Sequence, residues 1–320
     1  MEIPLLLRQA IDQALEGVAL GDLRRAAATL SERYRGEKLD GALHLSDDLA
    51  ARAYLATRLP ATYAAIRAAM TELAERRPDF SAHSLLDIGA GPGTVLWAAA
   101  DCWPGLATAR LIEASSAIRK WGEILARDST VAEIVWQAGD IAEGVGEAGR
   151  PDLVSLAYVL SELPAAARGR LVDDLWVLTG DTLLIVEPGT PRGWERILSA
   201  RTRLIAQGAH ILAPCPHAAP CPVAAPDWCH FARRVARSRL HRLAKDADVP
   251  WEDEKFIYLA ASRRPGLAAE ARILAPPRVG KGRIDLKLCC ADGTLQDRTL
   301  SKRDGATFKT ARRRDWGEIL

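Results

Sequence analysis

The chain has 320 residues, of which 48% are hydrophobic and 26% are charged, and its formal net charge at pH 7 is +2. This is ordinary globular composition, and the absence of an uncharged apolar run of about 18 residues excludes a helix that spans a membrane. The N-terminal Met-Glu-Ile-Pro lacks the basic segment and cleavage site of a signal peptide, so we expect a cytoplasmic protein with reduced cysteines and no membrane partner.

The charges are unevenly distributed along the chain. Residues 231–320 contain 21 Lys and Arg against 12 Asp and Glu, whereas residues 1–230 contain 22 basic and 29 acidic residues. A basic C-terminal third on an acidic body favours a polyanionic partner at one end of the molecule, although a solvated charged surface explains it equally well.

The hydrophobic pattern divides the chain into four regions. Residues 1–80 have helical periodicity, with helices expected over 5–15, 49–59 and 61–73, and predict an N-terminal helical cap. From residue 84, short apolar strands alternate with helices, which predicts a parallel sheet wrapped by helices. The expected strands are 84–88, 109–113, 133–137, 152–156 and 182–186, and the expected helices are 93–100, 116–126, 165–178 and 191–207. This core spans residues 81–208. A cysteine-rich insertion with a basic helix (231–245) occupies 209–250, and final core strands (255–261, 283–290) with a basic extension occupy 251–320.

A glycine loop joins the first expected strand to the first helix of the core. The sequence Leu-Leu-Asp-Ile-Gly-Ala-Gly-Pro-Gly-Thr at 85–94 places Asp87, Gly89, Gly91 and Gly93 where a backbone can approach a nucleotide closely and a helix N-terminus offers free N–H groups. The form D-x-G-x-G-x-G is typical of class I S-adenosylmethionine-dependent methyltransferases, while a dinucleotide such as NAD stays open.

Three further residues extend this candidate cofactor site. Glu113 ends the second strand, where a carboxylate accepts hydrogen bonds from both ribose hydroxyls. Asp140, after the third strand, matches the position where class I methyltransferases contact the adenine region, and Tyr158, after the fourth, resembles the segment beside the methionine moiety in such enzymes. The signatures of adenine amino-methylation and of cytosine C5 methylation are both missing from the expected strand ends, so the catalytic residues are unassigned.

Cysteines are concentrated between the fifth-strand helix and the next expected strand. Cys215, Cys221 and Cys229 have the spacing Cys-x5-Cys-x7-Cys in a proline-rich segment, and the adjacent Cys289 and Cys290 supply a fourth thiol. Neighbouring strand residues point oppositely, so only one of that pair can face the site, and Cys289 is preferred. Four thiolates suit zinc or a four-iron cluster, and nearby histidines keep a Cys3His zinc site open. Cys102 is expected in the core.

The basic C-terminal third offers candidate nucleic-acid contacts. Arg233, Arg234 and Arg237 belong to the expected basic helix, and Lys302, Arg303 and Arg312 lie near the end of the chain. Such a surface suits the phosphates and exposed loops of structured RNA.

Four segments together resemble the ribosomal small-subunit methyltransferase-like assembly factors, which are known from mitochondria and have shorter bacterial relatives. The segments are residues 85–94, the cysteine segment with its ending Asp-Trp-Cys-His-Phe (227–231), residues 252–259, and Trp316-Gly317. The resemblance implies a class I methyltransferase fold, S-adenosylmethionine binding and association with small-subunit rRNA. It also implies a [4Fe-4S] cluster on Cys215, Cys221, Cys229 and Cys289 or Cys290.

The leading hypothesis is therefore a monomeric assembly factor for the small ribosomal subunit. It binds S-adenosylmethionine, rRNA and small-subunit assembly intermediates, and a [4Fe-4S] cluster organises it. The alternatives are an active rRNA methyltransferase of the small subunit and a zinc-stabilised small-molecule methyltransferase without an RNA partner.

Overall fold

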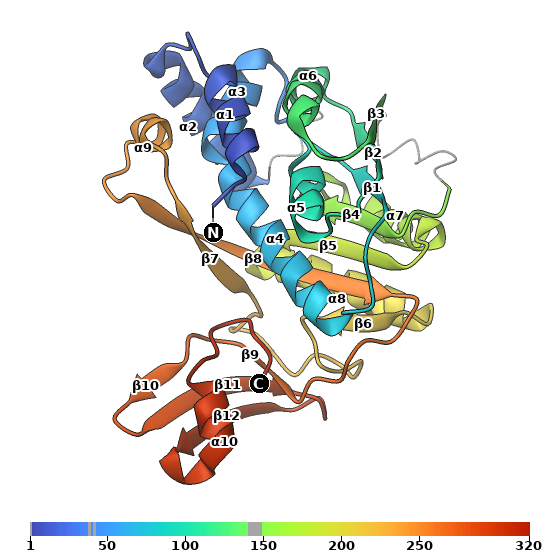
Figure 1. Ribbon diagram of the computed structural model, residues 1–320, viewed down its shortest axis with the longest axis vertical. Helices are drawn as coiled ribbons and strands as arrows, with labels where there is room; N and C mark the ends of the chain where they lie inside the picture. The colour runs from blue at the N-terminus through green and yellow to red at the C-terminus, as the bar shows by residue number, and fades with distance from the viewer. Residues whose placement is uncertain (1, 38–39, 41–42, 140–148) are drawn as a thin grey trace.

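A computed structural model describes residues 2–37, 40, 43–139 and 149–320. Its centre is an eight-stranded sheet in the order β3-β2-β1-β4-β5-β8-β6, with β7 paired to β8 (Figure 1). The strands of this sheet are β1 (Ser84–Ile88), β2 (Thr108–Glu113), β3 (Glu133–Ala138), β4 (Leu153–Ala157), β5 (Thr182–Pro188), β6 (His210–Ala213), β7 (Phe231–Ala236) and β8 (Trp251–Ser262).

The strand order and directions identify the fold. Strands β1 to β5 are parallel, and β8 runs antiparallel to both β5 and β6. Five parallel strands in the order 3-2-1-4-5 followed by an antiparallel strand form the class I methyltransferase arrangement, so the predicted fold is confirmed. Chain order reverses between β1 and β4, and ligands of such sheets bind at the carboxyl ends of the strands beside that point.

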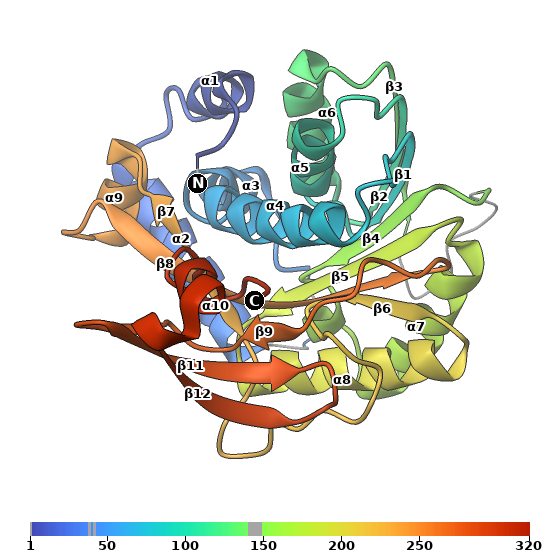
Figure 2. The same ribbon diagram turned by 60° about the horizontal axis from the view of Figure 1, so that its bottom comes forward.

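Helices cover both faces of the sheet. Figure 2 shows α4, α5 and α6 on one face and α7 and α8 on the other. The helices up to this point are α1 (Leu5–Ala14), α2 (Leu20–Gly36), α3 (Asp48–Thr57), α4 (Leu59–Arg76), α5 (Thr94–Cys102), α6 (Ser116–Leu125), α7 (Ala165–Leu178) and α8 (Pro191–Ala206). In the described part of the chain, no helix is both long and apolar enough to cross a membrane.

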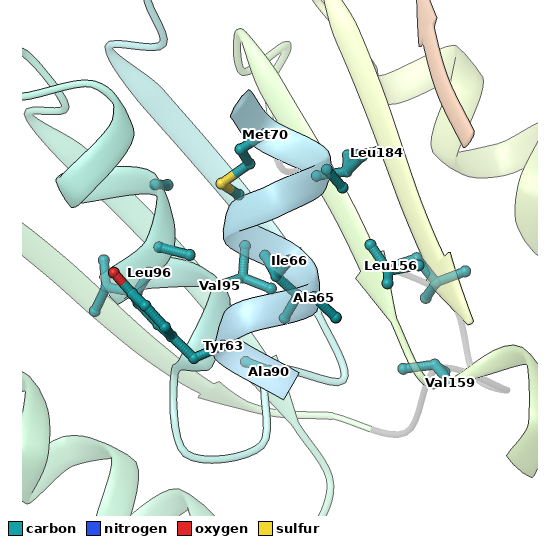
Figure 3. Packing of buried hydrophobic residues seen from close by; sticks show 14 of the residues in the cluster. Tyr63, Ala65, Ile66, Met70, Ala90, Val95, Leu96, Leu156, Val159 and Leu184 are labelled. Atoms are coloured by element: carbon teal, nitrogen blue, oxygen red, sulfur yellow. The ribbon is translucent and has the colours of Figure 1, made fainter. Parts of the chain in front are cut away.

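Helix α4 joins the N-terminal helices to the main core. It is buried around most of its circumference, as expected of a helix that is apolar on most sides. Figure 3 shows its Ile66 and Met70 among Leu96 of α5 and Leu156 and Leu184 of the sheet. The N-terminal helices therefore share one hydrophobic core with the sheet.

The expectation of a basic helix over residues 231–245 is wrong. Residues Phe231–Ala236 form β7, which pairs antiparallel with the first half of β8, and only Arg239–Lys245 is helical (α9). Phe231 and Val235 are buried on one face, the two-residue alternation of a strand. Across the pair, Arg234 lies opposite Asp253 and forms two hydrogen bonds with it, of 2.8 and 3.0 Å. Cross-strand pairs of opposite charge stabilise the antiparallel pair of β7 and β8, which we call the hairpin, and so favour a strand over a helix here.

A second, smaller sheet follows β8. Strands β9 (Ala271–Ile273), β10 (Arg278–Gly280), β11 (Arg283–Cys290) and β12 (Leu295–Ser301) form it, and α10 (Gly305–Ala311) packs against it. It has a hydrophobic cluster of its own, including Ile284, Leu288, Cys290 and Phe308. Figure 1 shows this orange-to-red module beside one end of the main sheet. Residues 263–320 carry fourteen Lys and Arg against seven Asp and Glu, so the module is basic.

Candidate functional site

The glycine loop lies at the carboxyl end of β1, beside the point where the strand order reverses. Gly89, Gly91 and Gly93 have positive φ angles of 68°, 54° and 78°, which residues with a side chain rarely adopt. The backbone N–H groups of Gly89 and Ala90 both donate to the carbonyl of Ile112, at 2.9 and 3.0 Å. The loop is thereby fixed to β2, and Gly93 is the N-cap residue of helix α5.

Glu113 holds the loop from the end of β2. Its two carboxylate oxygens accept hydrogen bonds from the N–H groups of Gly91 and Ser115, each at 2.8 Å. Burial raises the pKa of Glu113 above its ordinary value, and these backbone donors oppose that effect. A carboxylate has about four acceptor positions, so these two bonds leave capacity for ribose hydroxyls.

A cavity of about 1150 Å³ opens in front of the loop. Drug-sized and cofactor-sized ligands commonly occupy pockets of about 300–1,000 Å³, so this cavity can hold a nucleoside cofactor with space left over. The N-terminal helices and α9 form its outer wall. Its lining includes Tyr34, Arg58, Gly91, Glu113, Tyr158 and Lys245.

Tyr158 connects three parts of the cavity wall. It is one of the few described residues other than glycine with a positive φ, 63°, and its N–H donates to the carbonyl of Val186 at 2.7 Å. Its hydroxyl donates to Glu254 of β8 at 3.1 Å, and Arg58 at the start of α4 donates to the same carboxylate at 3.2 Å. The end of β4, the hairpin and the cap are therefore held together at the cavity.

The other predicted cofactor residues divide between the cavity and the core. Gly89 and Gly91 line the cavity, whereas Gly93 does not, and a Cβ added there would contact Trp136; Asp87 is fully buried in β1. Asp140 lies outside the described residues.

Asp87 is a buried carboxyl with one satisfied oxygen. Ser155 donates to its Oδ1 at 2.7 Å, whereas its Oδ2 has no hydrogen-bond partner among the described residues. Burial raises the pKa of Asp87 to about 7. Between the ordinary pKa of an aspartate and about pH 7, Asp87 therefore keeps its proton in the folded protein, whereas it has lost that proton in the unfolded chain.

We expect Asp87→Asn to stabilise the ligand-free protein at pH 8 by roughly 2 kcal/mol, because the variant no longer buries a charge there. The stabilisation should shrink as the pH falls from about 7 and disappear below the ordinary pKa of an aspartate, because Asp87 is then neutral in both states. Thermal unfolding of the wild type and the variant across this range measures the difference. A difference that does not depend on pH would contradict the assigned pKa.

Glu187, at the end of β5, has a structural role in the described protein. It is fully buried, accepts a hydrogen bond from the Leu160 N–H at 3.0 Å and forms an ion pair with Arg196 of α8 at 2.6 Å. Arg196 also pairs with Glu37 at the end of α2. Glu187 thus connects α8 with the loop after β4 and with the cap.

A second cavity lies between α8, β8 and the small sheet. Cys215, Cys221, Cys229 and Cys289 all line it, with apolar side chains of α8 and β8 around them. Cys290 instead belongs to the core of the small sheet. Burial, followed by interactions with the other three cysteines, raises the pKa of Cys229. His217 lies beside these cysteines, with its Nε2 3.3 Å from Cys289 Sγ.

Aromatic residues from two distant segments meet beside these cysteines. Trp228 and His230, which flank Cys229, have stacked rings with centroids 5.0 Å apart, and His230 meets Trp316 edge-on at 5.0 Å. A Cβ at Gly317 would lie 3.0 Å from the ring of Phe231, so only glycine fits closely there. The motifs 227–231 and 316–317 therefore belong to one site.

The candidate nucleic-acid residues fall into two groups. On the hairpin, Arg234 pairs with Asp253 and Arg237 with Glu252, and Arg233 donates to the Trp316 carbonyl at 3.4 Å. Lys302, Arg303 and Arg312 lie exposed on the small module, around α10. The second group presents its charge to solvent, whereas the hairpin group is largely neutralised by the acidic residues of β8.

Sequence comparison decides the family. The family model described as "Mitochondrial small ribosomal subunit Rsm22" matches residues 48–320, which include the glycine loop and the residues that line the cysteine cavity. The chain belongs to the Rsm22 family.

Curated relatives of this Rsm22-family protein are mitochondrial. It is 29% identical over 303 residues to the human "Ribosome assembly protein METTL17, mitochondrial", covering 83% of this chain and 61% of that protein. It is 23% identical over 320 residues to the "Rsm22-cox11 tandem protein 2, mitochondrial" of Schizosaccharomyces pombe, covering 84% of this chain and 42% of that protein. The chain thus spans between two fifths and three fifths of the length of these relatives.

Among solved structures, the chain is similar to magnesium protoporphyrin IX methyltransferase of Synechocystis, with bound S-adenosylmethionine. The identity is 15%, the TM-score is 0.43, and the match covers 78% of this chain and all of that one. The fold assignment of this Rsm22-family protein rests on its own strand order.

Several residues of the first cavity were not predicted from the sequence. Tyr34 and Arg24 of α2, Arg58 just before α4 and Lys245 of α9 line it although they are far from the glycine loop in the chain. The acidic run at 252–254 lies opposite the arginines of β7. It was a signal in the sequence that β7 pairs with β8.

Proposed function

We propose that this Rsm22-family protein is an assembly factor of the small ribosomal subunit that binds S-adenosylmethionine and rRNA and is organised by a [4Fe-4S] cluster. The observation that carries the proposal is the position of the cysteine cavity. It is lined by α8 and β8 of the methyltransferase fold and by Arg272, Leu274 and Cys289 of the basic module. A group bound to these cysteines would fix the position of the basic module relative to the methyltransferase fold.

The choice of a cluster over zinc rests on the resemblance of the cysteine segment to the small-subunit assembly factors, since four thiolates suit either group. A tetrahedral zinc ion needs all its ligands within about 2.1–2.3 Å of one point. A [4Fe-4S] cluster binds each of four thiolates to a different iron atom, so its ligands surround a larger centre. The cluster would supply a redox-active anionic centre, and Cys215, Cys221, Cys229 and Cys289 would hold it.

The S-adenosylmethionine part of the proposal has support from the first cavity. Gly89 and Gly91 of the loop and the Glu113 carboxylate line it, and the loop leads directly into the N-terminus of α5. These groups suit the methionine, ribose and adenine parts of a nucleoside cofactor.

The lining of the first cavity disfavours one kind of rRNA methylation. Cytosine C5 methylation needs a cysteine nucleophile, and no described cysteine lines the first cavity. A labelled-methyl transfer assay on immature small subunits from a deletion strain decides between an assembly role and rRNA methylation. Transfer at background level supports the assembly role, and transfer to a defined rRNA nucleotide would replace it with the methyltransferase alternative.

The rRNA-binding surface is proposed to lie mainly on the small module. Lys302, Arg303 and Arg312 are exposed there on neighbouring segments, in a module with an excess of basic residues. Phosphate contacts by such side chains release counterions, which makes binding strongly dependent on salt.

We expect the triple variant K302Q/R303Q/R312Q to bind a small-subunit rRNA fragment more weakly and with a less steep dependence on salt. The slope of log affinity against log salt concentration should fall by roughly 2, since each lost phosphate contact contributes about 0.7–0.9. Filter binding between 50 and 300 mM salt measures it. The matched control is Arg234→Gln on the hairpin, where Asp253 already pairs with the arginine. An unchanged slope in the triple variant would place the RNA surface elsewhere.

A further inference from the structure

Two buried arginines line the cysteine cavity together with the four thiols. Arg201 of α8 is 3% exposed and Arg272 of β9 is 1% exposed. A buried guanidinium is stable only where hydrogen bonds and an opposite charge compensate for its loss of hydration. The partners of these two arginines therefore show what charge the cavity is built to receive.

Arg272 is fully compensated by protein groups. It forms a buried ion pair with Glu72 of α4 and donates to the carbonyls of Pro214 at 2.8 Å and Gly317 at 2.6 Å. These bonds attach the start of the cysteine segment and the C-terminal residues to helix α4. Its charge is neutralised by Glu72, so its role is to hold the cavity wall.

Arg201 has no such carboxylate. Its Nη2 donates to the carbonyls of His217 and Ala219, at 2.7 and 2.8 Å, and so fastens the segment between Cys215 and Cys221. Its Nε is buried and has no hydrogen-bond partner among the described residues, and within them Arg201 forms no ion pair. A buried cation without an anion is strongly destabilising, which indicates that an anionic group completes the site.

We propose that Arg201 is the charge partner of the cluster and raises its reduction potential. This inference rests on the proposed cluster. A [4Fe-4S] core with four thiolate ligands is anionic, and it gains one further negative charge when it takes up an electron. A fixed cation beside it stabilises the reduced form more than the oxidised form, because potentials of such clusters follow net charge and hydrogen bonding around the sulfurs.

The test compares the reduction potential of the cluster in four anaerobically purified full-length proteins: wild type, R201Q, R201K and R203Q. Arg203 is the matched control, since it lies on the same helix but is exposed and pairs with Asp173. We expect R201Q to have a lower potential by a tenfold or greater change in the reduction equilibrium, ~59 mV for a one-electron couple. R201K, which keeps the charge, and R203Q should stay close to the wild type.

Each other outcome also decides the proposal. R201Q with a full complement of iron and the wild-type potential would overturn it. If R201Q is isolated without iron, R201K that retains the cluster at the wild-type potential supports the role of the charge. Loss of iron from both variants, with circular dichroism like that of the wild type, would show that Arg201 only fastens the segment, and would overturn the proposal. Wild-type protein without iron would instead remove the proposed function and this inference with it.

Discussion

Replacing Cys221 with serine is expected to remove the iron from anaerobically purified protein and leave the glycine-loop cavity intact. Cys221 lies in the segment without helix or strand between β6 and β7 and lines the cavity together with three other cysteines. Loss of one thiolate opens the cluster to solvent, and the segment around it and the small sheet should lose protection from hydrogen exchange. Affinity for S-adenosylmethionine should stay within about twofold, because Cys221 does not line that cavity.

The matched control for this variant is Cys102→Ser. Cys102 ends helix α5, where its thiol lies 3.8 Å from the Met70 carbonyl, and it does not line the cysteine cavity. Its iron content should equal that of the wild type. Unchanged iron in Cys221→Ser would exclude Cys221 as a ligand and leave the cluster without its proposed set of four thiolates.

Replacing Glu113 with alanine is expected to weaken binding of S-adenosylmethionine by about 100-fold. The carboxylate fixes the Gly91 N–H of the loop and would accept hydrogen bonds from the ribose, and bonds to charged groups contribute about 1.5–3 kcal/mol each. Titration calorimetry with S-adenosylmethionine measures the loss.

Glu123→Ala controls for the removal of a carboxylate nearby. Glu123 lies on α6, is half exposed and has only a long ion pair with Arg119, at 3.8 Å. It should bind S-adenosylmethionine like the wild type. If Glu113→Ala retains wild-type affinity and a normal unfolding temperature, the cofactor does not use the end of β2.

The parts of the fold that depend on local pattern were predictable from the sequence. The strand Ser84–Ile88 and the helix Ala165–Leu178 have the predicted bounds, because alternating apolar runs and helical periodicity are properties of single segments. The predicted helix over 231–245 combines a real basic helix, Arg239–Lys245, with the basic strand β7 that precedes it, because both segments carry closely spaced arginines. The strand conformation of β7 depends on the acidic residues of β8, which lie well beyond it in the chain.

The two candidate sites were also predictable only in part. Their glycines and cysteines could be recognised in the sequence, because the spacing of these residues is itself the motif. The charges around the cysteine cavity could not be predicted. Arg201 and Arg272 are ordinary basic residues in the sequence, and they acquire their role only because the fold buries them. Likewise, Tyr34 and Arg58 reach the first cavity only because the cap helices pack over the loop.

The measurement that tests the central proposal most directly is the iron and acid-labile sulfide content of the full-length protein purified without oxygen, together with its absorption spectrum. The proposal predicts four iron and four sulfide per chain, with a broad visible absorption that bleaches on reduction. Stoichiometric zinc, or protein without metal that keeps the same stability and rRNA affinity, would contradict it.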